Sequence, residues 1–446
     1  MRRAEDKMRN GMIKYATLAA ALLVPGAAAA ESVDNLKLEY HGAGWLKLSR
    51  VENTFSISGS GNDYDRNWLG DAGGLISTSS KIDENWDGSF GIGTIMVQLA
   101  RGSIGQANKW YTFWVPFVSE ARLSYSTAGF AEKSGLQFNF GLQGYNYNPD
   151  VKNMGLYLIH GYVYPSNLVS GFGNVFGMVG KANYGMFSND LIVNMETEDK
   201  PLYDISFADV ATLHLPAGIE LGAGVNFYRA IPANKKATSP GFDCRPTDMG
   251  PYALEGQPDN NPCYYVLKDS SGKSIDSISG SLSGTKVMGR WRLDPKALFG
   301  GSETLGKDDL VLYGEVAVIG LKNYKYLYDK LNRRMPVMVG FNLPGFNFLN
   351  ASVEVEYYAY KLSGDNLGAQ GGSWVTAFDN AQVNTKRDDW KYSVNVSKVL
   401  AGNLAFSAQV ANDHLRIGGN HDNAVGQEAM RTPQDWYWTS KLAYFF

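Results

Sequence analysis

Cysteine, histidine and long apolar runs are scarce in this chain of 446 residues. It contains only two cysteines, Cys244 and Cys263, and five histidines, which is too few nearby ligands for a multi-cysteine metal or redox centre. Beyond the N-terminal region, no stretch approaches the roughly 20 apolar residues of a membrane-spanning helix. The formal net charge of −3 gives no basic footprint, so the sequence predicts no nucleic-acid partner.

The N-terminus has the pattern of a secretory signal peptide. Basic residues between Arg2 and Lys14 precede a short apolar run over 15–24 and the small residues up to Ala30. We therefore expect residues 1–30 to be removed and residues 31–446 to form a single domain. In an exported protein, Cys244 and Cys263, which flank a Pro-, Gly- and Asp-rich stretch, are expected to form a disulfide that staples a long loop.

Aromatic residues and glycine are abundant, and they are spread evenly along the chain with 26 Tyr, 21 Phe and 50 Gly. Apolar and polar residues alternate with period two, as in the segment that starts at Leu36, which indicates strands with one apolar face. Clear alternation covers 36–48, 136–142, 219–227, 310–318, 353–359, 390–396, 404–410 and 436–446. Weaker strands are predicted at 75–83, 89–101, 117–127, 174–184, 188–198, 201–214, 283–293 and 336–343.

Short and long connections between these segments alternate, as at 128–134 and 146–173. Strands of roughly ten residues, short turns and long loops are typical of outer-membrane barrels. The sequence thus predicts an all-β transmembrane antiparallel β-barrel of about 16 strands, within a range of 14–18, with long extracellular loops and short periplasmic turns. Periodicity alone does not separate this fold from a soluble sandwich; the export signal, strand length, loop asymmetry and C-terminus favour the barrel.

The last strand, from Trp436 to Phe446, places Trp438, Leu442, Tyr444 and Phe446 on one apolar face. This ending resembles the C-terminal signal of Gram-negative outer-membrane β-barrel proteins of porin-like type. The resemblance is to a broad class and to no specific characterised family. It implies residence in the cell outer membrane, contact with membrane lipid and lipopolysaccharide, and assembly by the barrel-assembly machinery.

The long connection 148–173 holds the position of the third outer loop, which in 16-stranded porins folds into the lumen and narrows it. The run from Asp150 to Leu158 is also similar to a stretch in uncharacterised outer-membrane proteins. The resemblance implies a constriction loop, whereas an outer loop that packs on its neighbours is equally compatible with the sequence. The constriction candidates are Asp150, Lys152, Tyr157, His160, Tyr162 and Tyr164.

Alternation along the strands also assigns charged residues to the lumen. The pore-lining candidates are Lys286, Arg290, Arg292, Glu354, Glu356, Glu315, Glu120, Arg122 and Glu220. A basic set opposite an acidic set would create a transverse field in the pore. Alternatively, these charges pair across neighbouring strands and merely keep the interior solvated.

The resemblance implies a porin-like channel through which small polar solutes diffuse passively, with no cofactor or metal and with the oligomeric state left open. A surface-exposed structural, adhesive or ligand-binding barrel with a blocked lumen is the alternative. A barrel lipid hydrolase is the least favoured reading, because no histidine has a triad-like spacing. That reading would require a serine and a histidine within hydrogen-bond reach on the wall.

Overall fold

The structure is a computed structural model, and its described residues are 38–53, 68–101, 109–130, 134–159, 173–197, 203–231, 233, 264–268, 273–279, 284–299, 304–321, 331–346, 349–358, 390–415, 430 and 432–446. The signal-peptide region 1–30, both cysteines of the expected disulfide, and the constriction candidates His160, Tyr162 and Tyr164 lie outside these described residues.

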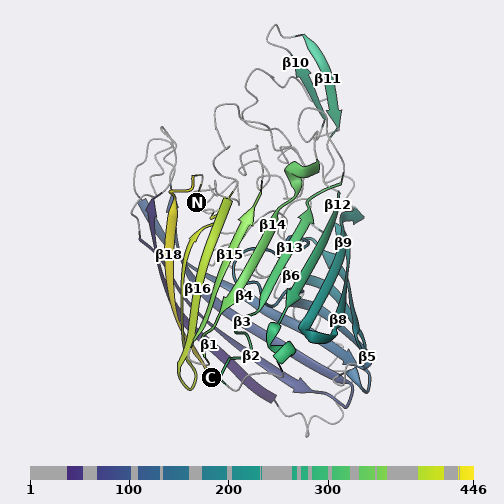
Figure 1. The fold of residues 1–446 in the computed structure, drawn as a ribbon, viewed down its shortest axis with the longest axis vertical. Helices are drawn as coiled ribbons and strands as arrows, with labels where there is room; N and C mark the ends of the chain where they lie inside the picture. Colours follow the sequence, from purple (N-terminus) through teal and green to yellow (C-terminus); the bar gives the residue numbers. More distant parts are fainter. Residues whose placement is uncertain are drawn as a thin grey trace, which may run out of the picture.

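Sixteen strands form one closed antiparallel barrel (Figure 1). They are β1 (Leu38–Asn53), β2 (Trp68–Lys81), β3 (Trp86–Arg101), β4 (Lys109–Ser126), β5 (Ser134–Tyr145), β6 (Gly173–Tyr184), β7 (Phe187–Met195), β8 (Ile205–Leu215), β9 (Ile219–Ile231), β12 (Gly284–Leu293), β13 (Leu312–Val318), β14 (Val337–Leu343), β15 (Asn350–Tyr357), β16 (Trp390–Ala401), β17 (Leu404–Asn412) and β18 (Trp436–Phe445). Strands β10 (Tyr264–Lys268) and β11 (Ser274–Ser279) form a separate two-stranded sheet, so β9 pairs with β12. The predicted barrel and its strand number are confirmed.

The barrel closes between its first and last strands. Strand β1 pairs antiparallel with β18 from Ala43 opposite Phe445 to Asn53 opposite Trp436. The backbone N–H of Gly42 also donates to the carbonyl oxygen of Phe446 at 2.7 Å. Closure leaves neither strand with a row of unpaired backbone groups, which is the condition for a sheet to stand in hydrocarbon.

The two faces of the wall differ as the period-two alternation predicts. On β1, the side chains of Leu46 and Leu48 are exposed on the outer surface, whereas Lys47 and Ser49 are buried inside. The same arrangement recurs on β18, where Leu442 and Tyr444 point outward. An apolar exterior around a polar interior is the arrangement that a lipid-spanning barrel requires.

The connections are short at the barrel end that holds the C-terminus and mostly long at the other end (Figure 1). Residues 185–186 and 402–403 are tight turns, and the 3₁₀ helix η3 (Pro216–Gly218) fills a third. One connection departs from this pattern, because 294–311 contains η4 (Pro295–Phe299) and is 18 residues long at the short-turn end. A further 3₁₀ helix, η5 (Leu331–Arg334), lies in the opposite connection between β13 and β14.

Helices contribute little to the described part of the chain. None of them is long and apolar enough to cross a membrane.

Candidate functional site: a loop segment inside the barrel

The chain that leaves β5 turns into the barrel interior instead of outward. Residues Asn146–Ile159, called here the inner segment, belong to the third long connection. The segment consists of turns, because Gly155 and Leu156 both have positive φ angles, 110° and 58°. Such angles interrupt a right-handed helix, so the segment does not continue as one.

Glu315 on β13 holds the middle of the inner segment. Its carboxylate accepts hydrogen bonds from the Tyr147 hydroxyl at 2.6 Å and the Asn148 side-chain amide at 3.3 Å. It also accepts from the backbone N–H groups of Leu156 at 3.1 Å and Tyr157 at 2.8 Å. The carboxylate is buried, and four donors supply the hydrogen bonds that water would otherwise provide.

Glu354 on β15 holds the preceding turn in a similar way. It accepts from the backbone N–H groups of Lys152, Asn153 and Met154 at 2.6, 2.8 and 2.9 Å, and from the Tyr313 hydroxyl at 2.8 Å. Three successive backbone N–H groups that converge on one anion form a nest, a concave anion site made of main chain. Here Glu354 of the wall is the anion, and the backbone of Lys152, Asn153 and Met154 forms the nest.

Two further contacts join the segment to the barrel end that carries the long connections. The Tyr157 hydroxyl donates to Glu356, and Glu356 lies 2.5 Å from Nε2 of His414. The Asn153 side-chain amide donates to Asp413 at 2.8 Å. Burial raises the pKa of Asp413 to about 6, and it raises the pKa of Tyr157 well above the usual value of a tyrosine.

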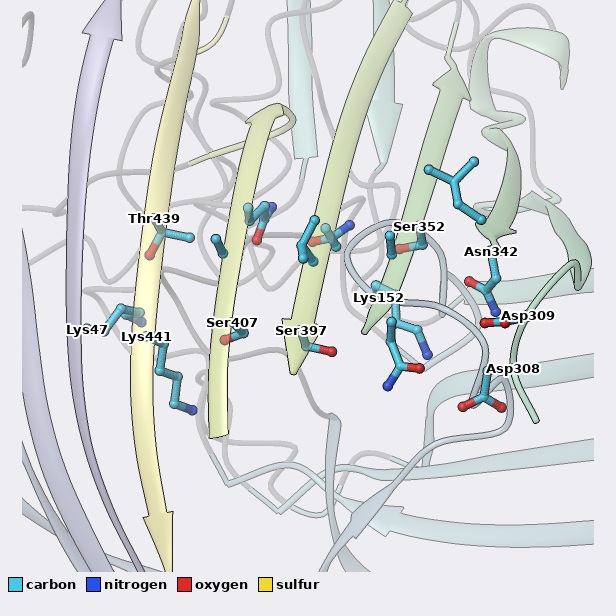
Figure 2. Close-up of a pocket in the computed structure, with 17 residues that line it drawn as sticks. Lys47, Lys152, Asp308, Asp309, Asn342, Ser352, Ser397, Ser407, Thr439 and Lys441 are labelled. Carbon is cyan, nitrogen blue, oxygen red and sulfur yellow. The ribbon is translucent and has the colours of Figure 1, made fainter. Parts of the chain in front are cut away.

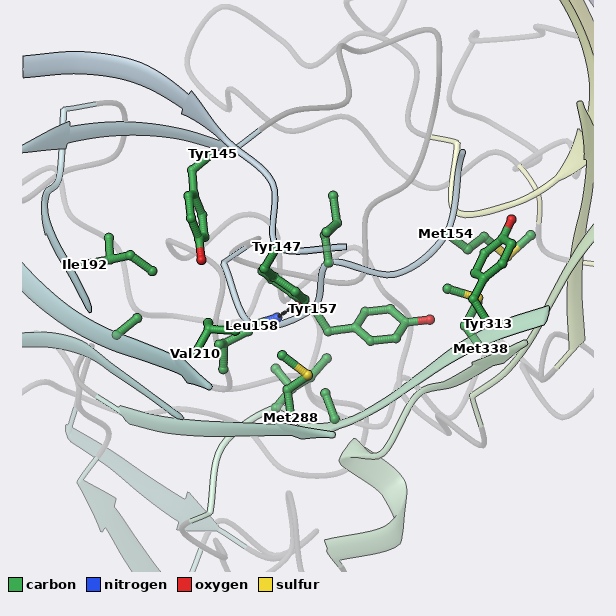
Figure 3. Close-up of a cluster of buried hydrophobic side chains, with 14 of the residues drawn as sticks. Tyr145, Tyr147, Met154, Tyr157, Leu158, Ile192, Val210, Met288, Tyr313 and Met338 are labelled. Carbon is green, nitrogen blue, oxygen red and sulfur yellow. Dashed lines mark hydrogen bonds between the residues drawn. The ribbon is translucent and has the colours of Figure 1, made fainter. Parts of the chain in front are cut away.

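Apolar side chains of the inner segment pack against one side of the barrel (Figure 3). Met154, Tyr157 and Leu158 are almost completely buried. Leu158 lies beside Val210 and Met288 of the wall, and Met154 lies beside Tyr313 and Met338. The amide of Asn226 on β9 donates to the carbonyl oxygen of Leu158 at 2.8 Å. The segment therefore fills the lumen on this side with a packed apolar cluster.

The basic residues of β12 lie next to acidic partners. Arg292 Nε lies 3.0 Å from Asp150 of the inner segment, and its guanidinium also lies 4.0 Å from Glu220 and 3.6 Å from Asp294. Arg290 lies 3.7 Å from Glu220. Burial raises the pKa of Asp150 while the Arg292 charge opposes that shift. These charges form a paired network rather than a one-signed ladder.

The remaining pore-lining candidates occupy two different environments. Arg122 and Glu120 on β4 lie 3.0 Å apart and are partly exposed to the interior. Lys286 is buried, with its ammonium 5.4 Å from the Tyr228 ring centroid. Glu315, Glu354 and Glu356 face inward, but the inner segment covers all three.

A cavity of about 290 Å³ remains on the other side of the inner segment, against β14 to β18 and β1 (Figure 2). Uncharged polar side chains cover most of this wall. Lys47 and Lys441 border the cavity at one end and Lys152, Asp308 and Asp309 at the other. The interior is thus divided into an apolar, filled side and a polar, open side.

A serine, a histidine and a glutamate also meet on the inner wall near the short-turn end. Ser188 Oγ on β7 lies 3.2 Å from Nε2 of His214 on β8. Nδ1 of the same imidazole lies 3.5 Å from Glu220 on β9. Only the register of three strands brings these residues together, which is why sequence spacing gave no sign of them. No group of three or more metal-ligating side chains occurs within the described ranges.

Several residues of the site were not predicted from the sequence, namely Tyr147, Tyr313, Ser188 and Lys441. Asn148 and Asn153 lie within the expected loop but were not named as candidates. Asp150, Lys152 and Tyr157, by contrast, were assigned to the loop; in the structure they lie inside the barrel. Asp150 and Tyr157 contact the wall through their side chains and Lys152 through its backbone N–H.

No protein-family model and no curated protein matches this chain. Among solved structures, OmpF of Salmonella typhi, in complex with daunomycin, aligns over 93% of this chain and 99% of its own, with 11% identity and a TM-score of 0.44. A mutant porin of Rh. blastica aligns over 92% of this chain and 100% of its own, with 12% identity and a TM-score of 0.40. A triple mutant of the Rhodopseudomonas blastica porin gives 11% identity and a TM-score of 0.41 over the same shares.

The barrel itself defines the class of this molecule. A closed antiparallel barrel of 16 strands, with an apolar exterior and a polar, open side to its lumen, is a porin-like transmembrane β-barrel.

Proposed function

We propose that this protein is an outer-membrane channel through which small polar solutes diffuse passively, narrowed by the inner segment. The observation that carries the proposal is the division of the lumen, because the segment closes one side and leaves a polar cavity on the other. Pore width and lining groups determine what a channel passes.

The anchoring of the inner segment supports a fixed constriction rather than a mobile lid. The buried carboxylates of Glu354 and Glu315 each accept four hydrogen bonds. Three of those to Glu354 and two of those to Glu315 come from the backbone of the segment, and Tyr157 adds a further wall contact through Glu356. Hydrogen bonds to a charged group contribute about 1.5–3 kcal/mol each. A segment held in this way keeps the pore width constant.

Planar-bilayer conductance of the refolded protein tests the channel. Stable current steps are expected, and the reversal potential in a salt gradient gives the ion preference. The channel proposal is contradicted if the protein is folded, as shown by heat-modifiable gel migration, and inserted into the bilayer but produces no current steps. The packed apolar cluster would then favour the alternative, a surface-exposed barrel with a blocked lumen that binds partners through its outer loops.

One arrangement favours a second function of a different class. Ser188, His214 and Glu220 have the order of a nucleophile, a general base and an orienting acid. Against a hydrolase, the imidazole is 40% exposed in a water-accessible lumen, and Glu220 is shared with Arg290 and Arg292. Labelling with a fluorophosphonate probe tests this second function. Labelling of the wild type that is absent in Ser188→Ala supports an esterase, and no labelling of the wild type rules the esterase out.

A further inference from the structure

Two lysines face each other at one end of the cavity. Lys47 on β1 and Lys441 on β18 are directly opposite in the strand register, and both border the cavity. Like charges in directly opposite positions destabilise a pair of strands. One carboxylate, Asp71, lies 2.5 Å from Lys47, while the Lys441 ammonium lies 5.5 Å from the ring centroid of Trp45. This end of the cavity therefore attracts an anion.

The wall between the two ends of the cavity presents hydrogen-bonding groups without charge. Asn342 on β14 is buried, and neither polar atom of its side-chain amide has a hydrogen-bond partner in the part of the chain that the structure describes. Oδ1 of Asn395 on β16 is in the same condition. Ser397 and Gln409 border the cavity on β16 and β17. Amides and hydroxyls of this kind pair with the hydroxyl groups of a solute, which supplies both donors and acceptors.

The far end of the cavity has a different charge balance. Lys152 of the inner segment borders it beside Asp308 and Asp309 (Figure 2). Asp309 already accepts from the backbone N–H groups of Gly306 and Phe346 at 2.9 Å each, and these donors lower its pKa. The cavity is thus cationic at the Lys441 end, neutral along its wall and mixed at the opposite end.

We propose that this cavity is a binding site for small organic anions that carry several hydroxyl groups, with the anionic group at Lys441 and Lys47 and the hydroxyls along β14 to β17. The proposal rests on the proposed channel function and names the class of solute that the channel holds in transit. A carboxylate and a phosphate satisfy the same two ammonium groups. Simple anions satisfy only the lysines, and neutral polyols only the amides and hydroxyls.

Current block in planar bilayers tests the site with four probes. Gluconate and glycerol phosphate carry both features, acetate lacks the hydroxyls and glucose lacks the charge. We expect half-block by the first two at concentrations about tenfold or more below those for acetate and glucose, because each removed set of hydrogen bonds weakens binding by that order. Comparison of gluconate with glycerol phosphate distinguishes a carboxylate from a phosphate preference. Equal block by acetate and gluconate overturns the proposal.

Variants locate the site. Lys441→Gln should raise the half-block concentration of gluconate about tenfold, and Asn395→Ala should reduce the difference between gluconate and acetate. Lys181→Gln on β6, which removes an equal charge beside Asp190 and away from the cavity, should leave gluconate block unchanged. Block that is insensitive to Lys441→Gln in a conducting channel places any binding elsewhere and overturns the site.

Calorimetric titration of gluconate into the refolded protein in detergent separates this proposal from the channel itself. If the protein binds gluconate in a Lys441-dependent way but does not conduct, the binding site is supported and the channel function is contradicted. If the protein conducts normally but shows neither gluconate binding nor selective block, the channel function is supported and the binding site is contradicted.

Discussion

The carboxylate of Glu354 lies 2.6 Å from the backbone nitrogen of Lys152, although the two residues are about two hundred positions apart in the chain. This contact joins β15 to the inner segment across the lumen. Because the accompanying bonds to Asn153 and Met154 also come from main chain, many side-chain substitutions in this turn would leave the anchor intact. A substitution of Glu354, in contrast, alters the acceptor of all three backbone hydrogen bonds.

Glu354→Gln should release the inner segment. A glutamine keeps the size but replaces one acceptor oxygen by an NH₂ group, which then faces backbone donors. We expect a loss of about 2–3 kcal/mol in the free energy of unfolding and a larger, noisier single-channel conductance. Glu39→Gln, an exposed carboxyl on β1, is the control and should change neither. Unchanged conductance in a destabilised Glu354→Gln protein would show that the segment does not set the pore width.

Gly155→Ala should destabilise the same segment for a steric reason. The φ angle of 110° at Gly155 is one that residues with a Cβ rarely adopt, and an added Cβ would lie 2.9 Å from Met338 Cε. We expect a cost of about 1–3 kcal/mol in urea unfolding. Gly144→Ala, where an added Cβ meets nothing within 4 Å, should be tolerated. Equal stability of the two variants would contradict this account of the turn.

Tyr157→Phe removes only the hydroxyl that reaches Glu356. The ring stays in its apolar surroundings, so the change isolates one hydrogen bond to a buried carboxylate. A loss of about 1–3 kcal/mol is expected in unfolding experiments. Tyr40→Phe, on the exposed outer face of β1, should cost little. A neutral Tyr157→Phe would mean that His414 alone satisfies Glu356.

Much of the wall could be predicted from sequence because a strand leaves a local signature. Alternation of the kind seen at Leu46, Lys47 and Leu48 requires only that one face meets lipid and the other meets the lumen. It therefore yielded the strand number and the inward direction of Glu315 and Glu354. Alternation gives the side of a residue but not its depth, so it could not show that the inner segment covers these carboxylates.

The contacts of the inner segment leave no such signature. Tyr147 and Glu315 are 168 residues apart, and Asn153 and Asp413 are 260 residues apart. Neither pair follows from periodicity, since each depends on the barrel register and on the path of the loop. For the same reason, the meeting of Ser188 with His214 became visible only with the pairing of β7 and β8.

Asp413 should make the free energy of unfolding depend on pH between about pH 4 and about pH 6. Its pKa is about 6 in the folded protein, above the value of about 3.9 in an unfolded chain. The folded protein therefore favours the protonated Asp413 carboxyl. The stability associated with this protonation is fully present below about pH 4 and is lost as the pH rises through about 6. Asp413→Asn should exceed the wild type in unfolding free energy by about 2–3 kcal/mol at alkaline pH and by little at about pH 4. Urea unfolding across this range measures the difference, and a constant difference at all pH values would refute it.

Asp413→Ala serves as the matched variant for that experiment. Asparagine retains an acceptor for Asn153 and Tyr437, whereas alanine removes the acceptor of both hydrogen bonds. Asp413→Ala should therefore be less stable than Asp413→Asn at every pH, by about 1–3 kcal/mol. If both substitutions gave the same stability, the hydrogen bonds to Asp413 would contribute nothing.

Phe446 tests the role proposed for the C-terminal strand as an assembly signal. Its ring lies against Gly42, where an added Cβ would be 2.2 Å from it, and its backbone N–H donates to the Gly42 carbonyl at 3.0 Å. Removing the ring takes an apolar aromatic contact from the seam where β1 and β18 close the barrel. We expect Phe446→Ala to lower the yield and rate of barrel formation, measured as heat-modifiable protein in cells and in refolding. Phe445→Ala is the control. Successive side chains of a strand point to opposite faces, so Phe445 faces away from lipid and its removal should have the smaller effect. Equal defects would indicate that aromatic content, rather than the outward face, drives assembly.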